Sequence, residues 1–71
     1  MLKDRERTID TLLYATSITA DTDNLSTLAI AKAYINIVNI LNNCVDEDSL
    51  GAVWTELESI EENLSLALKE I

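Results

Sequence analysis

The chain has 71 residues, a formal net charge of −8, no histidine and no proline. A domain of this size buries only about 60% of the surface that its unfolded chain exposes, so it usually needs disulfides, a metal or oligomerisation for stability. Cys44 is the one cysteine, which excludes an intrachain disulfide, and without histidine a metal site would have to be all-oxygen or cysteine-poor. Self-association is therefore the expected source of stability.

The composition predicts a single all-α domain over residues 1–71. Gly51 is the only glycine, and a chain with so few turn signals favours long helices over sheets. The charged stretch MLKDRER at the N-terminus is not followed by the apolar run of a secretory signal, so we expect a cytoplasmic protein. From residue 33 onward Lys69 is the one cation against eight anions, which disfavours direct binding of DNA or RNA.

The first predicted helix covers residues 3–17. Ile9, Leu12 and Leu13 lie on one side of it, and the alternating charges of KDRER suit an exposed first segment. The next stretch, TSITADTDN over residues 16–24, is rich in β-branched and turn-forming residues. It is predicted to be the connection, with room for a frayed helix end at its start.

The second predicted helix covers residues 24–44. Asp23 or Asn24 can cap its N-terminus, and Asn42 and Asn43 are suitable stop residues. Its polar side chains follow one narrow stripe, which consists of Lys32, Asn36, Asn39 and Asn43. Nearly all other positions are apolar, whereas an ordinary surface helix buries a stripe of somewhat over 100°.

Three explanations compete for this surplus of apolar surface. Membrane insertion suits the length of residues 25–45, but Lys32 and the asparagines are costly in lipid. The three-helix fold could itself wrap the helix unusually well. Burial by another protein is favoured, with a second copy as the default partner, because twofold dimers dominate soluble oligomers. The small residues Ala29 and Ala33 would let two backbones approach closely. The predicted interface residues are Ile30, Tyr34, Ile37, Val38, Leu41 and Trp54.

The third predicted helix covers residues 47–71. Asp46 can cap it, with Val45 and Leu50 as a hydrophobic staple. Two apolar series repeat every seven positions, namely Leu50, Leu57, Leu64 and Ile71, and Val53, Ile60 and Ala67. We expect this stripe to pack onto the other helices of a three-helix bundle, since globular helices commonly carry one. Trp54 is either a core residue beside this stripe or an interface residue.

The acidic residues of the third helix are predicted to form a solvated face, with Glu56, Glu58, Glu61 and Glu62 as its candidates. The ExxE spacing of Glu58 and Glu61 also occurs in di-metal bundles, but such sites need inward-facing carboxylates and normally histidines. Cys44 has no histidine to act as its base and is expected to be a small buried apolar residue. We therefore predict no catalytic site, no metal, no cofactor and no enzymatic activity.

These features predict a small non-enzymatic interaction or regulatory protein that docks a helical surface on a partner protein. The alternative is an acidic mimic of nucleic acid that inhibits a DNA- or RNA-binding protein, as an anti-defence factor would. A subunit or chaperone for another protein would use the same apolar surface. The layout of three helices with a long first connection is similar to that of small enterobacterial regulators of biofilm and acid response, and small phage and plasmid proteins share it. The similarity implies a bacterial or phage source and carries over no site residue.

Overall fold

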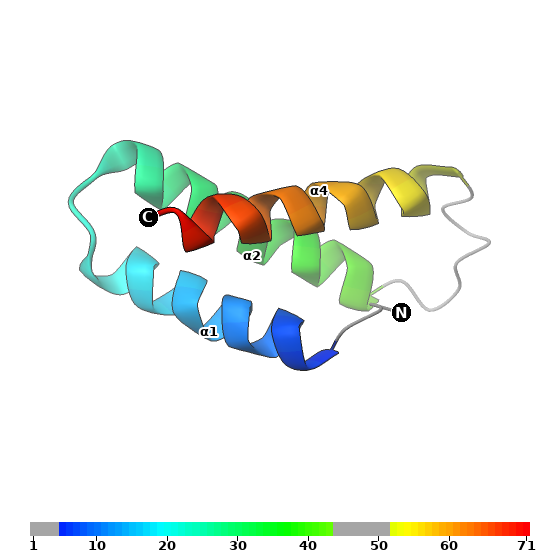
Figure 1. The fold of residues 1–71 in the computed structure, drawn as a ribbon, viewed down its shortest axis with the longest axis horizontal. Helices are drawn as coiled ribbons and strands as arrows, with labels where there is room; N and C mark the ends of the chain where they lie inside the picture. The colour runs from blue at the N-terminus through cyan, green and yellow to red at the C-terminus, as the bar shows by residue number, and fades with distance from the viewer. Residues whose placement is uncertain (1–4, 44–51) are drawn as a thin grey trace.

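The computed structural model describes residues 5–43 and 52–71. It contains three helices in these ranges, α1 (Arg5–Asp21), α2 (Leu25–Asn43) and α4 (Ala52–Lys69). Helices α1 and α4 run in the same direction and α2 runs in the opposite direction (Figure 1). The prediction of an all-α, three-helix bundle is therefore confirmed.

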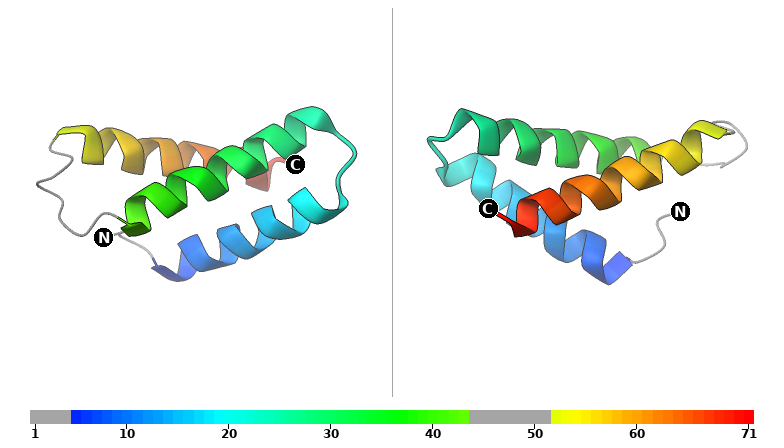
Figure 2. Two further views of the ribbon diagram at one scale, coloured as in Figure 1. Left: turned by 180° about the vertical axis from the view of Figure 1, so that it is seen from behind. Right: turned by 45° about the horizontal axis from the view of Figure 1, so that its top comes forward.

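Helix α2 is the central element. It packs along both α1 and α4, whereas α1 and α4 contact each other over a much shorter length. The views in Figure 2 show the same arrangement from behind and from above, with α2 lying against each of its two neighbours. Helix α2 therefore makes most of the contacts between the described helices.

Helix α1 extends four residues beyond its predicted end at residue 17, to Asp21. The predicted connection over residues 16–24 is confirmed only for residues 22–24. Residues 16–21 are helical instead, because threonines in this part bond within the helix. The Thr16 hydroxyl donates to the Leu12 carbonyl at 2.9 Å, and the Thr19 hydroxyl donates to the Thr16 carbonyl at 2.7 Å. Burial of Ile18 adds a packing contact that propensity alone does not include. The predicted start at residue 3 lies outside the described residues.

The start of α2 agrees with its predicted cap. The Asn24 side-chain oxygen accepts a hydrogen bond from the Thr27 amide at 3.0 Å, and the Asn24 carbonyl accepts one from the Leu28 amide at 2.9 Å. This is the arrangement in which an N-cap side chain satisfies an amide of the first turn. The prediction of a cap at residue 24 is therefore confirmed. The helix is described to Asn43, and its predicted end at residue 44 lies outside the described residues.

Helix α4 ends at Lys69, two residues before the predicted end. The last two amides, those of Glu70 and Ile71, donate to the Ala67 and Leu68 carbonyls at 3.2 and 3.3 Å. These three-residue spacings tighten the end of the helix, as is common at C-termini. The predicted cap and staple, Asp46, Val45 and Leu50, lie outside the described residues, and so does Cys44.

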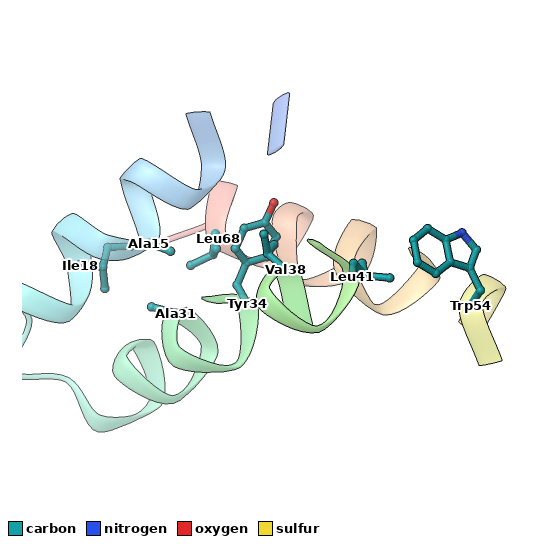
Figure 3. Packing of buried hydrophobic residues seen from close by; sticks show 8 residues of the cluster. All are labelled: Ala15, Ile18, Ala31, Tyr34, Val38, Leu41, Trp54 and Leu68. Atoms are coloured by element: carbon teal, nitrogen blue, oxygen red, sulfur yellow. The ribbon is translucent and has the colours of Figure 1, made fainter. Parts of the chain in front are cut away.

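The core is formed by eight apolar residues from all three helices, shown in Figure 3: Ala15, Ile18, Ala31, Tyr34, Val38, Leu41, Trp54 and Leu68. Ala31 points toward Ala15 and Ile18 of α1, where small side chains permit close approach of the two helices (Figure 3). Leu41 points toward Trp54 of α4 at the other end of the core.

The polar stripe of α2 faces solvent as predicted, because Lys32, Asn36, Asn39 and Asn43 are all exposed. The buried side of α2 consists of Ala31, Tyr34, Val38 and Leu41. Ala31 and Val38 are fully buried, whereas Ile30 and Ile37 are only partly covered. The physical reason is that α1 packs against the Ala31 side of the helix, so that the opposite flank remains open.

Candidate interaction surface

A charged cluster lies between the three helices, and its centre is Glu61 of α4. The guanidinium of Arg7 donates two hydrogen bonds to the Glu61 carboxylate, from Nη1 to Oε2 at 3.0 Å and from Nη2 to Oε1 at 2.6 Å. The hydroxyl of Tyr34 donates to Oε2 of the same carboxylate at 2.6 Å. Glu61 is only 2% exposed. One carboxylate therefore joins α1, α2 and α4.

A second polar contact lies one helical turn further along the same two helices. The hydroxyl oxygens of Thr11 and Ser65 are 3.3 Å apart and both residues are buried. Arg7 with Glu61 and Thr11 with Ser65 have the same separation in sequence, 54 residues, which is the pattern of two parallel helices in register. Within the described chain every buried side-chain nitrogen and oxygen has a hydrogen-bond partner. The contact between α1 and α4 is thus polar, and its buried polar side-chain atoms have hydrogen-bond partners.

The surroundings of Tyr34 keep its hydroxyl protonated. Burial raises the pKa of Tyr34 far above its usual range, and the hydrogen bond to Glu61 and the negative charge of Glu61 raise it further. The hydrogen bond with Thr11 and the charge of Arg7 lower it by a smaller amount. The hydroxyl therefore serves as a hydrogen-bond donor, and the carboxylate that accepts it is already occupied by Arg7. This cluster holds the three helices together through one carboxylate.

The burial of Glu61 corrects the prediction that it belongs to a solvated acidic face. Glu56 and Glu62 are exposed and Glu58 is half-buried, but Glu61 points inward. The physical reason is that Arg7 and Tyr34 together supply the charge and the hydrogen bonds that a buried carboxylate requires. Among the described residues, no three His, Cys, Asp or Glu side chains lie close enough to hold a metal ion.

Sequence reasoning missed Arg7, Thr11 and Ser65 as partners in this cluster. One signal was present, because Trp54, Glu61 and Leu68 repeat every seven residues and all three are buried. This series, rather than the aliphatic heptad stripe, marks the inner side of α4. The matching residues of α1 left no such signal, since threonine and arginine are ordinary on a surface.

Four of the six predicted interface residues lie in the core of the single chain, namely Tyr34, Val38, Leu41 and Trp54. They contact their own helices and are not available to a partner while the bundle is intact, so their prediction as interface residues is corrected. The core interpretation of Trp54 is confirmed, since its side chain is 6% exposed. Ile30 and Ile37 are half-buried and remain candidates at the edge of the open flank of α2.

Part of the aliphatic heptad stripe of α4 remains outside the core. Val53 and Ile60 are 49% and 42% exposed, while Leu57 and Leu64 are half-buried beside them. The core instead receives Trp54 and Leu68 from the neighbouring side of the helix. The expectation that the whole stripe packs onto the other helices is therefore wrong for its Val53 and Ile60 positions.

The open flanks of α2 and α4 lie on the same side of the molecule. Successive residues of a helix turn by about 100°. On α4, Ser65 marks the direction of α1, and Ile60 lies on the opposite side of Glu61. On α2, Ala31 marks the direction of α1, and the exposed residues Ala33 and Ile40 lie on the opposite side of Tyr34.

Both flanks therefore face away from α1, and Figure 2 (right) looks toward this side of the pair, with α1 passing behind α4. We define the α2/α4 face as Ala33 and Ile40 of α2 with Val53 and Ile60 of α4.

Helix α1 also carries exposed apolar residues on its outer side. Ile9 and Leu13 are 51% and 65% exposed, whereas its inner positions include Thr8, Thr11 and Ala15. The predicted apolar side of α1, with Ile9, Leu12 and Leu13, is thus mostly outside the bundle, and only Leu12 packs against the core. Polar contacts with Glu61 and Ser65 replace apolar ones on the inner side.

Helix α2 is the one helix among the described residues that is long and apolar enough to cross a membrane, a criterion that core helices of soluble proteins also meet. The burial of Tyr34, Val38 and Leu41 within the bundle accounts for part of this apolar composition. Comparison with known proteins finds no matching family model, no matching curated protein and no matching solved structure.

Proposed function

We propose that this chain is a non-enzymatic interaction or regulatory protein, which acts by docking a preformed helical surface on another protein. The observation that carries the proposal is the α2/α4 face, where aliphatic side chains from two rigid helices remain exposed. Contiguous exposed apolar surface on a small protein typically marks a site of association. Because the helices are already packed, docking on them requires little ordering of the chain.

Self-association into a homodimer is one form that this docking would take. The chain is small, and its three helices leave large apolar residues exposed on both the α2/α4 face and the outer side of α1. A dimer would bury some of this surface and stabilise a domain whose own core is limited. The dimer contact that we expect on α2 is its open flank, with Ala33, Ile37 and Ile40, rather than the buried residues around Tyr34.

The contacts of Glu61, the one buried acidic residue of the described chain, support a non-enzymatic role. Its carboxylate accepts hydrogen bonds from Arg7 and Tyr34 and so serves to join the helices. The expected partner is a protein, with no direct contact to nucleic acid or membrane. The cytoplasmic location and the bacterial or phage source stay predictions.

An acidic inhibitor of a DNA- or RNA-binding protein remains the second candidate. Glu56, Glu62 and Glu70 are exposed on α4, and the chain carries a net charge of −8. The burial of Glu61 removes one carboxylate from the surface that such a mimic would present. Association through these acids should weaken steeply with added salt, whereas docking through the α2/α4 face should be nearly insensitive to it.

Affinity capture with a matched pair of baits tests the proposed function. The wild-type chain and an Ile60→Asp variant are immobilised and exposed to lysate of the cells that make the protein. Each protein enriched by the wild type alone is then purified and titrated against the free chain by calorimetry. We expect saturable binding of at least one protein, either the chain itself or another. A chain that is monomeric and binds none of the purified candidates would contradict the proposal.

A further inference from the structure

We propose that a second copy of this chain covers the α2/α4 face, so that α2 and α4 of two copies form a four-helix core with the two α1 helices outside. This inference rests on the proposed function and names the partner and the contact. The dimer contact predicted from sequence centred on Tyr34, Val38 and Leu41, which are buried within the single chain. The contact proposed here lies on the exposed α2/α4 face instead.

The heptad stripe of α4 is the first observation that supports a helical partner. Val53, Ile60 and Ala67 repeat every seven residues, as do Leu57, Leu64 and Ile71. Such a repeat lets one helix pack along another over several turns at a shallow angle. Within the chain this seam is only half used, because Val53 and Ile60 remain exposed. A second α4 offers the same repeat and is therefore complementary to the first.

The distribution of charge is the second observation, and it selects a copy of this chain over a basic protein or an anionic lipid surface. Lys32 is the one charged residue of α2, and it lies about 80° to 100° around that helix from the face residues Ile40 and Ala33, at the outer edge of the face. On α4, Glu62 lies on the side of α1, and Glu56 lies at the outer edge of the face. The centre of the face thus has no charge that a basic partner would pair with.

Because the charges lie outside its centre, the face can meet its own copy without apposing like charges, despite the net charge of −8. That same net charge would repel an anionic lipid surface.

The size of the side that carries this face is the third observation. The molecule measures 39 × 21 × 18 Å, so a contact that extends beyond the four face residues along a long side can reach the roughly 800 Å² that each partner buries in a stable complex of standard size. The small side chain of Ala33 lets the two helical pairs approach closely at the centre of the contact. Antiparallel helix pairs stacked in this way give a four-helix bundle, a common packing arrangement.

Three single variants, measured by sedimentation equilibrium, test the assignment. Ile60→Asp places a negative charge in the proposed contact on α4. Ala33→Lys places a positive charge in the same contact on α2. Leu13→Asp on the outer side of α1 is the matched control, since it adds the same charge as Ile60→Asp at a residue that is 65% exposed. Helix content, measured by circular dichroism, identifies any variant that fails to fold. If one contact variant fails to fold, the other still tests the proposed contact.

We expect a dimer for the wild type and for Leu13→Asp. In Ile60→Asp and Ala33→Lys the dissociation constant should rise by roughly 100-fold or more, because twofold symmetry places each substitution in the contact twice. A dimer that survives both contact variants, or that only Leu13→Asp disrupts, overturns the inference and leaves the proposed function standing. A monomeric wild type also overturns it.

Flotation with phosphatidylcholine vesicles and the calorimetric titrations distinguish the remaining outcomes for a monomer. A monomer that floats with the vesicles has lipid as the occupant of the face. A monomer that binds another purified protein retains the proposed function without the dimer. A monomer that binds neither lipid nor protein contradicts both proposals.

Discussion

Tyr34 and Glu61 show how a buried ionised residue becomes tolerable in a small helical protein. A carboxylate that leaves water loses its hydration, and here Arg7 and Tyr34 replace it with three hydrogen bonds. Three helices contribute to one site, so the cluster favours this helix arrangement over alternatives in which an aliphatic side of α4 turns inward.

Replacing Tyr34 with phenylalanine should lower the free energy of unfolding at pH 7 by about 2 kcal/mol, since a hydrogen bond to a buried charged group is lost. The pKa of Tyr34 is raised in the folded chain. Its contribution is therefore fully present below pH 10, the usual tyrosine value, and decreases as the pH rises above it, because the unfolded chain then loses the proton first.

Urea denaturation of the wild type and Tyr34→Phe between pH 7 and pH 11 measures this dependence. The stability difference between the two proteins should shrink as the pH rises above 10. A stability difference between the two proteins that stays constant from pH 7 to pH 11 would contradict the raised pKa of Tyr34 in the folded chain.

Replacing Glu61 with glutamine should destabilise the fold by about 3 kcal/mol, because the guanidinium of Arg7 then loses the anion that accepts two of its hydrogen bonds. The neighbouring substitution Glu62→Gln is the control, since Glu62 is exposed and a surface substitution usually changes stability by less than about 0.5 kcal/mol. Thermal unfolding compares the two variants. Equal melting temperatures would contradict the burial of Glu61.

At the scale of the helices, local signals predicted the start of α2 and failed at the end of α1. Asn24 caps through its own side chain, which is information contained in a few residues. The continuation of α1 to Asp21 depends on hydroxyl bonds within the helix and on burial of Ile18 against other helices. Tertiary contacts of this kind override the low helix propensity of a threonine-rich segment.

The cap of α2 gives a prediction at this scale. Asn24→Ala removes the acceptor of the Thr27 amide and should reduce the free energy of unfolding by about 1 kcal/mol. Asp23→Ala is the matched control, because Asp23 is exposed and lies one residue before the cap. The midpoints of urea denaturation, measured at one pH and one salt concentration, compare the stability losses of the two variants. If Asp23→Ala costs more than Asn24→Ala, the cap has been assigned to the wrong residue.

At the scale of the whole molecule, the sequence predicted more apolar surface than three helices can bury, and the structure leaves such surface open. It could not predict which side of each helix is open. The aliphatic stripe of α4 and the apolar side of α1 were the natural candidates for the core, yet Trp54, Glu61, Thr8 and Thr11 are buried instead. A buried charged cluster is a property of three helices together, and no single-helix pattern contains it.

The solution mass of the wild-type chain, measured by light scattering over a range of protein concentrations and at two salt concentrations, tests this account most directly. The calculated mass of one chain is 7.9 kDa. Docking of the α2/α4 face on a second copy predicts about twice that mass, with little change between low and high salt because the centre of the contact is uncharged. A mass of one chain at every concentration would contradict it.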